Sequence, residues 1–202
     1  SNNGANELAY QLLLNEEYPS WLYAINLGGT TIWERWNSLN PDGTVSSTGM
    51  NSFNHYAYGS IVEWMYRDMC GLNPASGDDL LPGFCRARIA PKPDKALQWA
   101  RVRYQSAAGL FESGWHITEQ GRLSFTITIP FNVETQVILP DANAGEITIN
   151  GVACAEGTKQ GRNLLLQLDA GTYHIEYRPS RPYVNTYSTH TPIVKLIENK
   201  SA

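Results

Sequence analysis

The sequence predicts an α+β chain in which helices come first and an antiparallel β-sandwich follows. Near the start, apolar residues recur at the spacing of one helix face: Ala5, Leu8, Ala9, Leu12 and Leu13. The helical period returns from Ser52 to Cys70, and beyond Gly83 it gives way to an alternation of apolar and polar residues. A change of period from 3.6 to 2 indicates helices in the first part and strands in the second.

A long loop separates the two predicted helices. Residues 27–51 are rich in Gly, Thr, Asn and Ser and contain Trp33 and Trp36. Long ordered loops in compact domains are often functional. The second helix has an apolar stripe that includes Phe53, Tyr56 and Trp64, and Gly71 follows it as a suitable C-terminal stop.

The second part predicts short strands joined by tight turns. Residues 100–104 and 123–129 alternate between apolar and polar side chains. Turn signals stand at Ala108-Gly109, Gln120-Gly121, Asn150-Gly151 and Ala170-Gly171, a pattern typical of a two-sheet sandwich. Trp115 shares its strand parity with Phe111 and Ile117, which predicts a core position, whereas Trp99 shares parity with arginines and is open to solvent or to the helical part.

Residues 73–83 consist almost entirely of turn-forming residues, so we expect the domain boundary there. The predicted organisation is a helical part at 1–72, a linker at 73–83, a sandwich at 84–180 and a tail at 181–202. The tail either adds a last strand or returns to the helical part.

Composition excludes several classes of partner. The chain of 202 residues has a net charge of −4 and scattered basic residues, which argues against nucleic acid. Its apolar runs are far shorter than the ~20 residues that cross a bilayer, so we expect no membrane partner, and Ser1-Asn2-Asn3-Gly4 shows no signal peptide. Three cysteines match no metal spacing and predict mostly buried, reduced thiols, with a Cys70–Cys85 bridge as the alternative; no cofactor or metal is implied.

The segment Gly29–Trp36 is the first candidate site. It places the carboxylate of Glu34 between the indoles of Trp33 and Trp36, beside Arg35. Indole faces stack on the C–H faces of sugars, while charged groups bind hydroxyls, so a saccharide cleft is one interpretation. The alternative is that the two tryptophans are core anchors and that Glu34 and Arg35 are a solvated pair.

The segment Met50–Gly59 is the second candidate site. It places Ser52, Asn54 and His55 at the predicted helix N-terminus, where unsatisfied N–H groups favour a polar ligand. Ordinary N-capping, with His55 as an interior histidine, is the alternative.

These two segments closely resemble the end of the catalytic domain of bacterial α-L-rhamnosidases, glycoside hydrolase family 78. The resemblance rests on TTIWERW at 30–36 and MNSFNHYAYGSIVEWMYR at 50–67, and it continues through YPSW at 18–21. In the second part GFCRARIAPKP at 83–93 and the hairpin at 104–115 are similar to that family's C-terminal domain. The resemblance implies that the helices are the terminal ones of an (α/α)6 barrel.

The resemblance also implies an inverting hydrolysis of a rhamnose-containing glycoside or polysaccharide. In that chemistry one carboxylic acid protonates the leaving oxygen and an ionised carboxylate activates water. By resemblance Glu34 is the general base and His55 contacts the sugar, while Trp33, Arg35 and Trp36 line the pocket or hold Glu34. Arg35 would favour the ionised carboxylate if the two side chains face each other, although neighbours on a strand point opposite ways.

The general acid of the family lies upstream of the segments matched here. The remaining carboxylic residues that could replace this acid lie in segments predicted as helix, surface or turn: Glu63, Asp68, Asp78, Asp79 and Glu112. We therefore expect the isolated chain to be inactive and to self-associate through barrel helices whose apolar faces are exposed, with Leu8, Leu12, Leu13, Tyr56 and Trp64 among them. Cytoplasm and periplasm both remain open as locations.

Three rival interpretations remain. In the first, only the sandwich has a function, as a carbohydrate-binding module. In the second, the chain is the end of a different (α/α)6 glycosidase, and in the third it is a structural domain. Glycan binding that survives Glu34→Gln and deletion of residues 1–72 would favour the first.

Overall fold

The computed structural model describes residues 1, 3–46 and 49–183. It forms two compact units, Ser1–Trp64 and Met65–Ala202. The boundary thus falls inside the second helical stretch. The segment 73–83, expected to be a linker, contains the end of strand β1 (Leu72–Pro74) and two short 3-10 helices, η3 (Gly77–Asp79) and η4 (Pro82–Phe84). The tail beyond residue 183, expected as a last strand or a return to the helices, lies outside the described residues.

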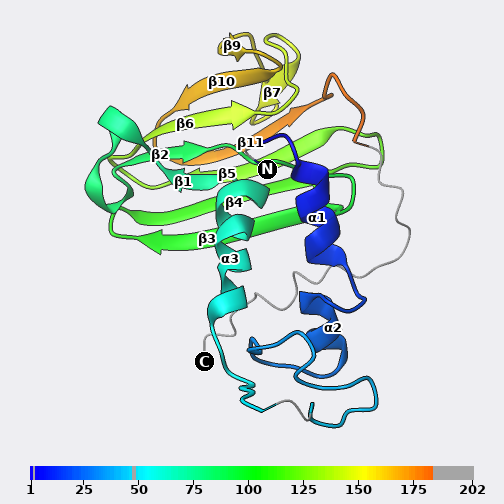
Figure 1. The fold of residues 1–202 in the computed structure, drawn as a ribbon. Coiled ribbons are helices and arrows are strands. Elements are labelled where there is room, and N and C mark those ends of the chain that lie inside the picture. The colour runs from blue at the N-terminus through cyan, green and yellow to red at the C-terminus, as the bar shows by residue number, and fades with distance from the viewer. Residues whose placement is uncertain (2, 47–48, 184–202) are drawn as a thin grey trace. The chain divides into compact units, whose positions relative to one another are not determined.

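Two helices begin the first unit (Figure 1). The predicted helix α1 spans Asn6–Leu14 and buries Tyr10 and Leu13. A second helix, α2 (Trp21–Asn26), follows at a place where we predicted none. Ser20 caps it by accepting a hydrogen bond from the Tyr23 N–H at 3.0 Å, a common helix start signal.

The other predicted helix begins later than expected. It consists of the 3-10 turn η1 (Ala57–Ser60), the short helix α3 (Ile61–Trp64) and the π-helical turn η2 (Met65–Met69). The prediction that Ser52, Asn54 and His55 form its first turn is therefore wrong. Backbone groups of Ser52 and His55 instead bond to the loop at residues 32–34, so they are unavailable to a helix. Gly71 ends the stretch with φ +73°, as predicted.

The second unit contains two β-sheets, which lie against each other in Figure 1. One sheet has the order β1-β2-β6-β10-β9 and the other β3-β4-β5-β11-β7-β8. The remaining strands are β2 (Arg86–Ile89), β3 (Trp99–Ser106), β4 (Gly109–Ile117), β5 (Leu123–Ile129), β6 (Glu134–Leu139), β7 (Ile147–Ile149), β8 (Val152–Cys154), β9 (Thr158–Gln160), β10 (Asn163–Leu168) and β11 (Gly171–Tyr177).

Alternating side chains from both sheets form the core of this unit. The five-stranded sheet contributes Ile89, Val137 and Leu164, and the six-stranded sheet contributes Phe125 and Ile175, all fully buried. This alternation is what the sequence predicted for β3 and β5. One pairing departs from the antiparallel prediction, because β2 and β6 run parallel, with Arg86 opposite Glu134.

Several local predictions for this unit are confirmed. All four turn signals lie where one strand gives way to the next: Gly109 and Gly171 are the first residues of β4 and β11, and Asn150-Gly151 joins β7 to β8 with φ of 51° and 79°. Trp115 is 2% exposed and donates its indole N–H to the Met69 carbonyl at 2.8 Å. The three cysteines are free, but only Cys70 is buried. Burial raises the pKa of the Cys70 thiol well above its usual range.

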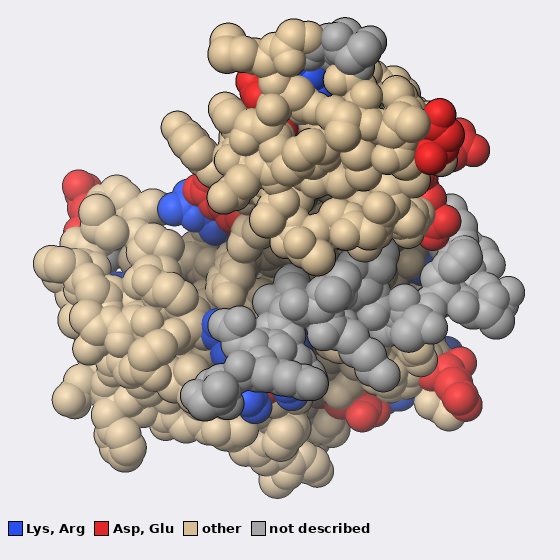
Figure 2. Space-filling model, turned by 90° about the horizontal axis from the view of Figure 1, so that it is seen from below, with Lys and Arg blue, Asp and Glu red and all other residues tan. Residues whose placement is uncertain are grey.

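The surface shows no single charged patch on the face drawn in Figure 2, where acidic and basic side chains lie in several separate groups. No helix in the described part of the chain is long and apolar enough to span a bilayer.

Candidate active site

Two segments of the first unit, 31–34 and 52–55, lie side by side. The Glu34 N–H donates to the Ser52 carbonyl at 2.8 Å, and the His55 N–H donates to the Ile32 carbonyl at 2.8 Å. The Thr31 hydroxyl adds a third link by donating to the Phe53 carbonyl. The two motifs that the sequence singled out separately are therefore one site, which brings the backbones of Glu34 and His55 together.

The Glu34 side chain is half-buried and makes no hydrogen bond or ion pair with any residue in the described part of the chain. Its backbone is nevertheless fixed through Ser52. Arg35 is held at its carbonyl, which accepts hydrogen bonds from the backbone N–H and the hydroxyl of Ser38. A carboxylate with a fixed backbone and unoccupied oxygens can accept a proton from water or bind a hydroxyl.

His55 has one ring nitrogen engaged. Its Nδ1 accepts a hydrogen bond from the Ala57 N–H at 3.4 Å, and its ring stacks on Tyr56 with centroids 5.6 Å apart. A neutral imidazole that accepts at Nδ1 carries its proton on Nε2. The free edge of the ring is therefore a donor.

Trp33 packs against the protein interior. It is 5% exposed, and its ring meets Phe53 edge to face at 5.5 Å. Gly29 lies so close that an added Cβ would be 2.9 Å from the indole and 2.7 Å from the Ala24 carbonyl. Trp33 thus has the contacts of the core anchor that we considered as the alternative, and it fixes the chain next to Glu34.

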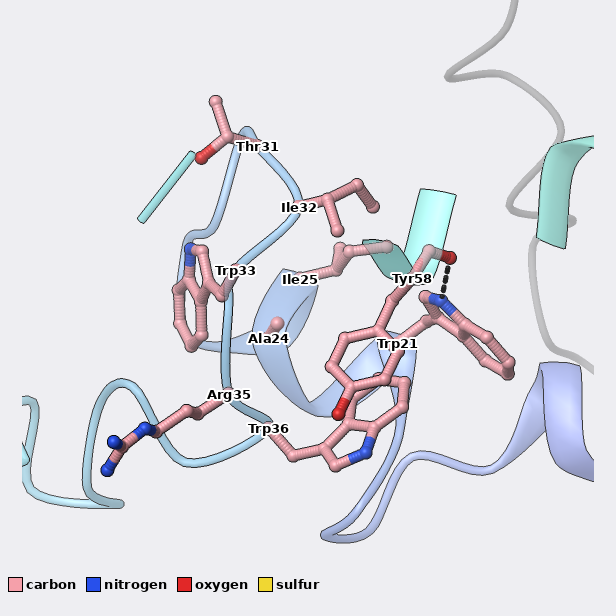
Figure 3. Close-up of a pocket in the computed structure, with 9 residues that line it drawn as sticks. All are labelled: Trp21, Ala24, Ile25, Thr31, Ile32, Trp33, Arg35, Trp36 and Tyr58. Carbon is pink, nitrogen blue, oxygen red and sulfur yellow. Dashed lines mark hydrogen bonds between the residues drawn. The ribbon is translucent and has the colours of Figure 1, made fainter. Parts of the chain in front are cut away.

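Trp36 belongs to an aromatic cluster with Trp21 and Tyr58. Its ring stacks on Tyr58 at 4.0 Å and meets Trp21 edge to face at 5.2 Å. Trp21 donates its indole N–H to the Tyr58 carbonyl at 3.0 Å, the dashed line in Figure 3. Trp21 and Tyr58 lie within the longer sequence motifs, but we did not predict them as residues of the site.

This cluster borders a small hollow of about 60 Å³. Figure 3 shows Trp33 apart from the other rings, with Ala24 and Ile25 between, and Arg35 directed away from the cluster. Glu34 and His55 do not line the hollow. Ligand pockets measure roughly 300–1,000 Å³, so this hollow alone is too small for a sugar.

Comparison with known proteins identifies the fold that these segments belong to. Residues 1–69 match the bacterial alpha-L-rhamnosidase 6 hairpin glycosidase domain, and residues 71–153 match the bacterial alpha-L-rhamnosidase C-terminal domain. The chain belongs to the bacterial α-L-rhamnosidase family. The helical unit is the end of a six-hairpin glycosidase domain, and the two sheets form the C-terminal domain that follows it.

Curated relatives carry the same name. An alpha-L-rhamnosidase of an Alteromonas species is 40% identical over 68% of this chain, and one of Formosa agariphila is 38% identical over 81%. The chain spans only 14% and 16% of these relatives.

Solved structures agree with this assignment. The Streptomyces avermitilis alpha-L-rhamnosidase complexed with L-rhamnose aligns with 88% of this chain at a TM-score of 0.74 and 31% identity, with 16% of that chain covered. The alpha-L-rhamnosidase from Dictyoglumus thermophilum aligns at a TM-score of 0.75 and 28% identity, with 88% of this chain and 19% of that chain covered.

Carboxylates elsewhere in the described part of the chain are engaged or remote in sequence from the site. Glu112, which we expected at the surface, is 7% exposed on β4 and bonds to Arg103 at 2.7 Å, so that prediction is wrong. Asp68 forms an ion pair with Lys92. Within residues 1, 3–46 and 49–183, no group of three His, Cys, Asp or Glu side chains could hold a metal ion.

Proposed function

We propose that this chain supplies the catalytic base of an inverting α-L-rhamnosidase, which hydrolyses terminal α-L-rhamnosyl residues from glycosides or polysaccharides. The observation that carries the proposal is the half-buried carboxylate of Glu34, which has no partner among the described residues, on a backbone hydrogen-bonded to the His55 segment. The L-rhamnose in the Streptomyces avermitilis structure supports a rhamnosyl substrate.

In this proposal Glu34 removes a proton from the water that attacks the anomeric carbon. The water oxygen forms the new bond to carbon, the glycosidic bond breaks, and a second carboxylic acid gives its proton to the leaving oxygen. That acid lies in the remainder of the six-hairpin domain. The isolated chain therefore has one half of the acid–base pair and should be inactive.

His55 binds the sugar rather than transferring the proton. Its Nε2–H can donate to a rhamnose hydroxyl while Nδ1 stays on the Ala57 N–H. Trp33 holds Glu34 in position through its buried ring, and Arg35 and Trp36 contribute to the wall of the cleft.

The rest of the barrel also explains the exposed apolar side chains of the helical unit. Leu8, Leu12 and Tyr56 are exposed, whereas Leu13 is buried and Trp64 is half-buried against Tyr10. Because the relatives are several times longer than this chain, their additional helices are the natural cover for these side chains. In their absence we propose that the isolated chain self-associates through this surface.

The test is Glu34→Gln in the full-length enzyme. General acid–base catalysis contributes roughly 10²- to 10⁴-fold, so kcat on 4-nitrophenyl α-L-rhamnoside should fall by that factor with little change in KM. Glu63→Gln, an exposed carboxylate on α3, is the matched control and should retain activity.

Two further measurements complete the test. Proton NMR of the first product should show the β-anomer of rhamnose, as inversion requires. The proposal fails if Glu34→Gln retains normal kcat, if the first product is the α-anomer, or if the purified 202-residue chain turns over the substrate.

A further inference from the structure

The outer face of the five-stranded sheet contains a second, polar hollow. Its volume is about 310 Å³, and among the residues that line it are Ser76, Arg86, Arg88, Glu134, Gln136 and Gln167. This volume lies within the range of small-molecule pockets, at its lower end. The hollow is thus large enough for a single sugar ring.

Strand register brings three of these side chains into one row. Arg88 on β2 pairs with Gln136 on β6, and Gln136 pairs with Gln167 on β10. Their strand neighbours Ala87 and Val137 are buried, so the row points away from the core. Three neighbouring strands therefore present a guanidinium and two amides on the same side.

The polar groups in the hollow divide into an engaged pair and an unengaged row. Arg86 and Glu134 neutralise each other through an ion pair of 2.7 Å. Arg88, Gln136 and Gln167 have no side-chain partner among the residues that the structure describes. The lining therefore retains one uncompensated positive charge, next to two amides that can each donate and accept hydrogen bonds.

We propose that this hollow binds an acidic sugar unit, a uronate residue of a glycan. The Arg88 guanidinium would bind the carboxylate through two parallel hydrogen bonds, and the two glutamines would bind ring hydroxyls. The lining residues include no aromatic ring. Since stacking on an aromatic ring is the main attraction for a neutral sugar, the chemistry of this site favours a charged sugar.

This site is separate from the proposed cleft and does not depend on it. The hollow lies entirely within residues 75–167, whereas Glu34 and His55 belong to the other unit. It would allow the C-terminal domain to hold an acidic polysaccharide whatever reaction the full enzyme performs. Failure of the Glu34 test leaves this proposal intact.

The experiment is a titration of the ¹⁵N-labelled 202-residue chain, followed by NMR of the Arg Nε–H and Gln side-chain amide signals. The probes are methyl β-D-glucuronide, methyl β-D-glucoside and acetate, which separate the carboxylate from the sugar ring. We expect saturable shifts of Arg88, Gln136 and Gln167 with the glucuronide, at a Kd on the order of 1 mM. The glucoside and acetate should each bind at least about 10-fold more weakly.

Variants identify the side chains responsible. Arg88→Gln should weaken glucuronide binding by at least about 10-fold, and Gln136→Ala by about 2- to 10-fold. Arg178→Gln is the matched control, because Arg178 is also exposed but follows β11 in the other sheet. Equal binding of acetate and glucuronide, equal loss in the Arg178→Gln control, or no saturable shift would each overturn the proposal.

Discussion

The two units differ in how completely each one buries its own apolar residues. In the unit of sheets, every second residue of β5 is buried. In the helical unit, Leu8 and Leu12 on α1 are 53% and 56% exposed, and Tyr56 is 89% exposed. The proposed catalytic residues lie in the unit with the less complete core. A sandwich can satisfy its own strands, whereas terminal barrel hairpins need their neighbours.

Two glycines with nearly the same backbone conformation test this contrast most severely. Gly71 has φ +73° and Gly43 has φ +79°. A Cβ at Gly71 would lie 2.1 Å from the backbone of Ala90 and Pro91, whereas nothing lies within 4 Å of one at Gly43. Gly71→Ala should therefore destabilise its unit by more than about 4 kcal/mol, and Gly43→Ala by about 1 kcal/mol from backbone strain alone.

Urea unfolding followed by circular dichroism measures both glycine variants. Where Gly71→Ala does not accumulate as folded protein, Gly71→Ser should fail in the same way and Gly43→Ser should not. Equal effects at the two positions would show that the close approach of Gly71 to Ala90 does not limit stability.

Alkaline pH should destabilise the unit of sheets. Burial raises the pKa of the Cys70 thiol and, together with Tyr183 and Asp141, the pKa of the Tyr177 hydroxyl. Both groups lose their protons more readily when unfolded, at about 8.5 and 10. Stability is therefore complete below pH 8 and falls above it by about 1.4 kcal/mol per pH unit for each ionising group.

Unfolding curves in urea between pH 7 and pH 11 measure this dependence. Cys70→Ala should remove the part of the slope that begins near pH 8.5, and Tyr177→Phe the part that begins near pH 10. The slope of the free energy of unfolding against pH is compared between each variant and the wild type, because each substitution also changes stability at neutral pH. A slope unaffected by either variant would contradict this account.

The sequence predicted the sheets better than the site because the sequence signals for strands and turns are local. Alternation identified β5, and Asn150-Gly151 identified a turn, since each needs only a few neighbouring residues. The start of the second helix was misplaced because Phe53 and Tyr56 fit the helical period. What decides their backbone is the pairing of segment 52–55 with residues 31–34, which no local pattern reveals.

The parallel pair of β2 and β6 was invisible for the same reason, since 44 residues separate β2 from β6 along the chain. Helix α2 was missed although Ser20 gave a usable cap signal. Among the candidate residues, Glu34 and His55 were proposed from long motifs and stay predictions, while the placement of Trp33 inside the protein required its contact with Gly29.

Trp115 tests a single hydrogen bond in the C-terminal domain. Its indole N–H bonds to the Met69 carbonyl at 2.8 Å. Trp115→Phe leaves that carbonyl without its partner and removes part of the ring, so we expect a loss of about 1–3 kcal/mol. Trp99→Phe, at a half-buried position on β3, is the control and should cost less in the same urea titration. Equal losses would show that the hydrogen bond to Met69 contributes little.

Leu12 tests the proposed cover of the helical unit, with the smallest expected effect on stability. Leu12→Gln replaces an exposed apolar side chain on α1 with a polar one of good helix propensity, so the free energy of unfolding should change by less than about 0.5 kcal/mol. Self-association should nevertheless weaken, because the apolar surface shrinks. Sedimentation velocity over a range of concentrations measures self-association, and urea unfolding measures the free energy of unfolding. Val152→Thr changes an apolar side chain on β8 that is 70% exposed, more than Leu12, and should leave association unchanged. If the wild-type chain is monomeric at all concentrations, or if both variants dissociate it equally, the apolar face of α1 is not what brings the copies together.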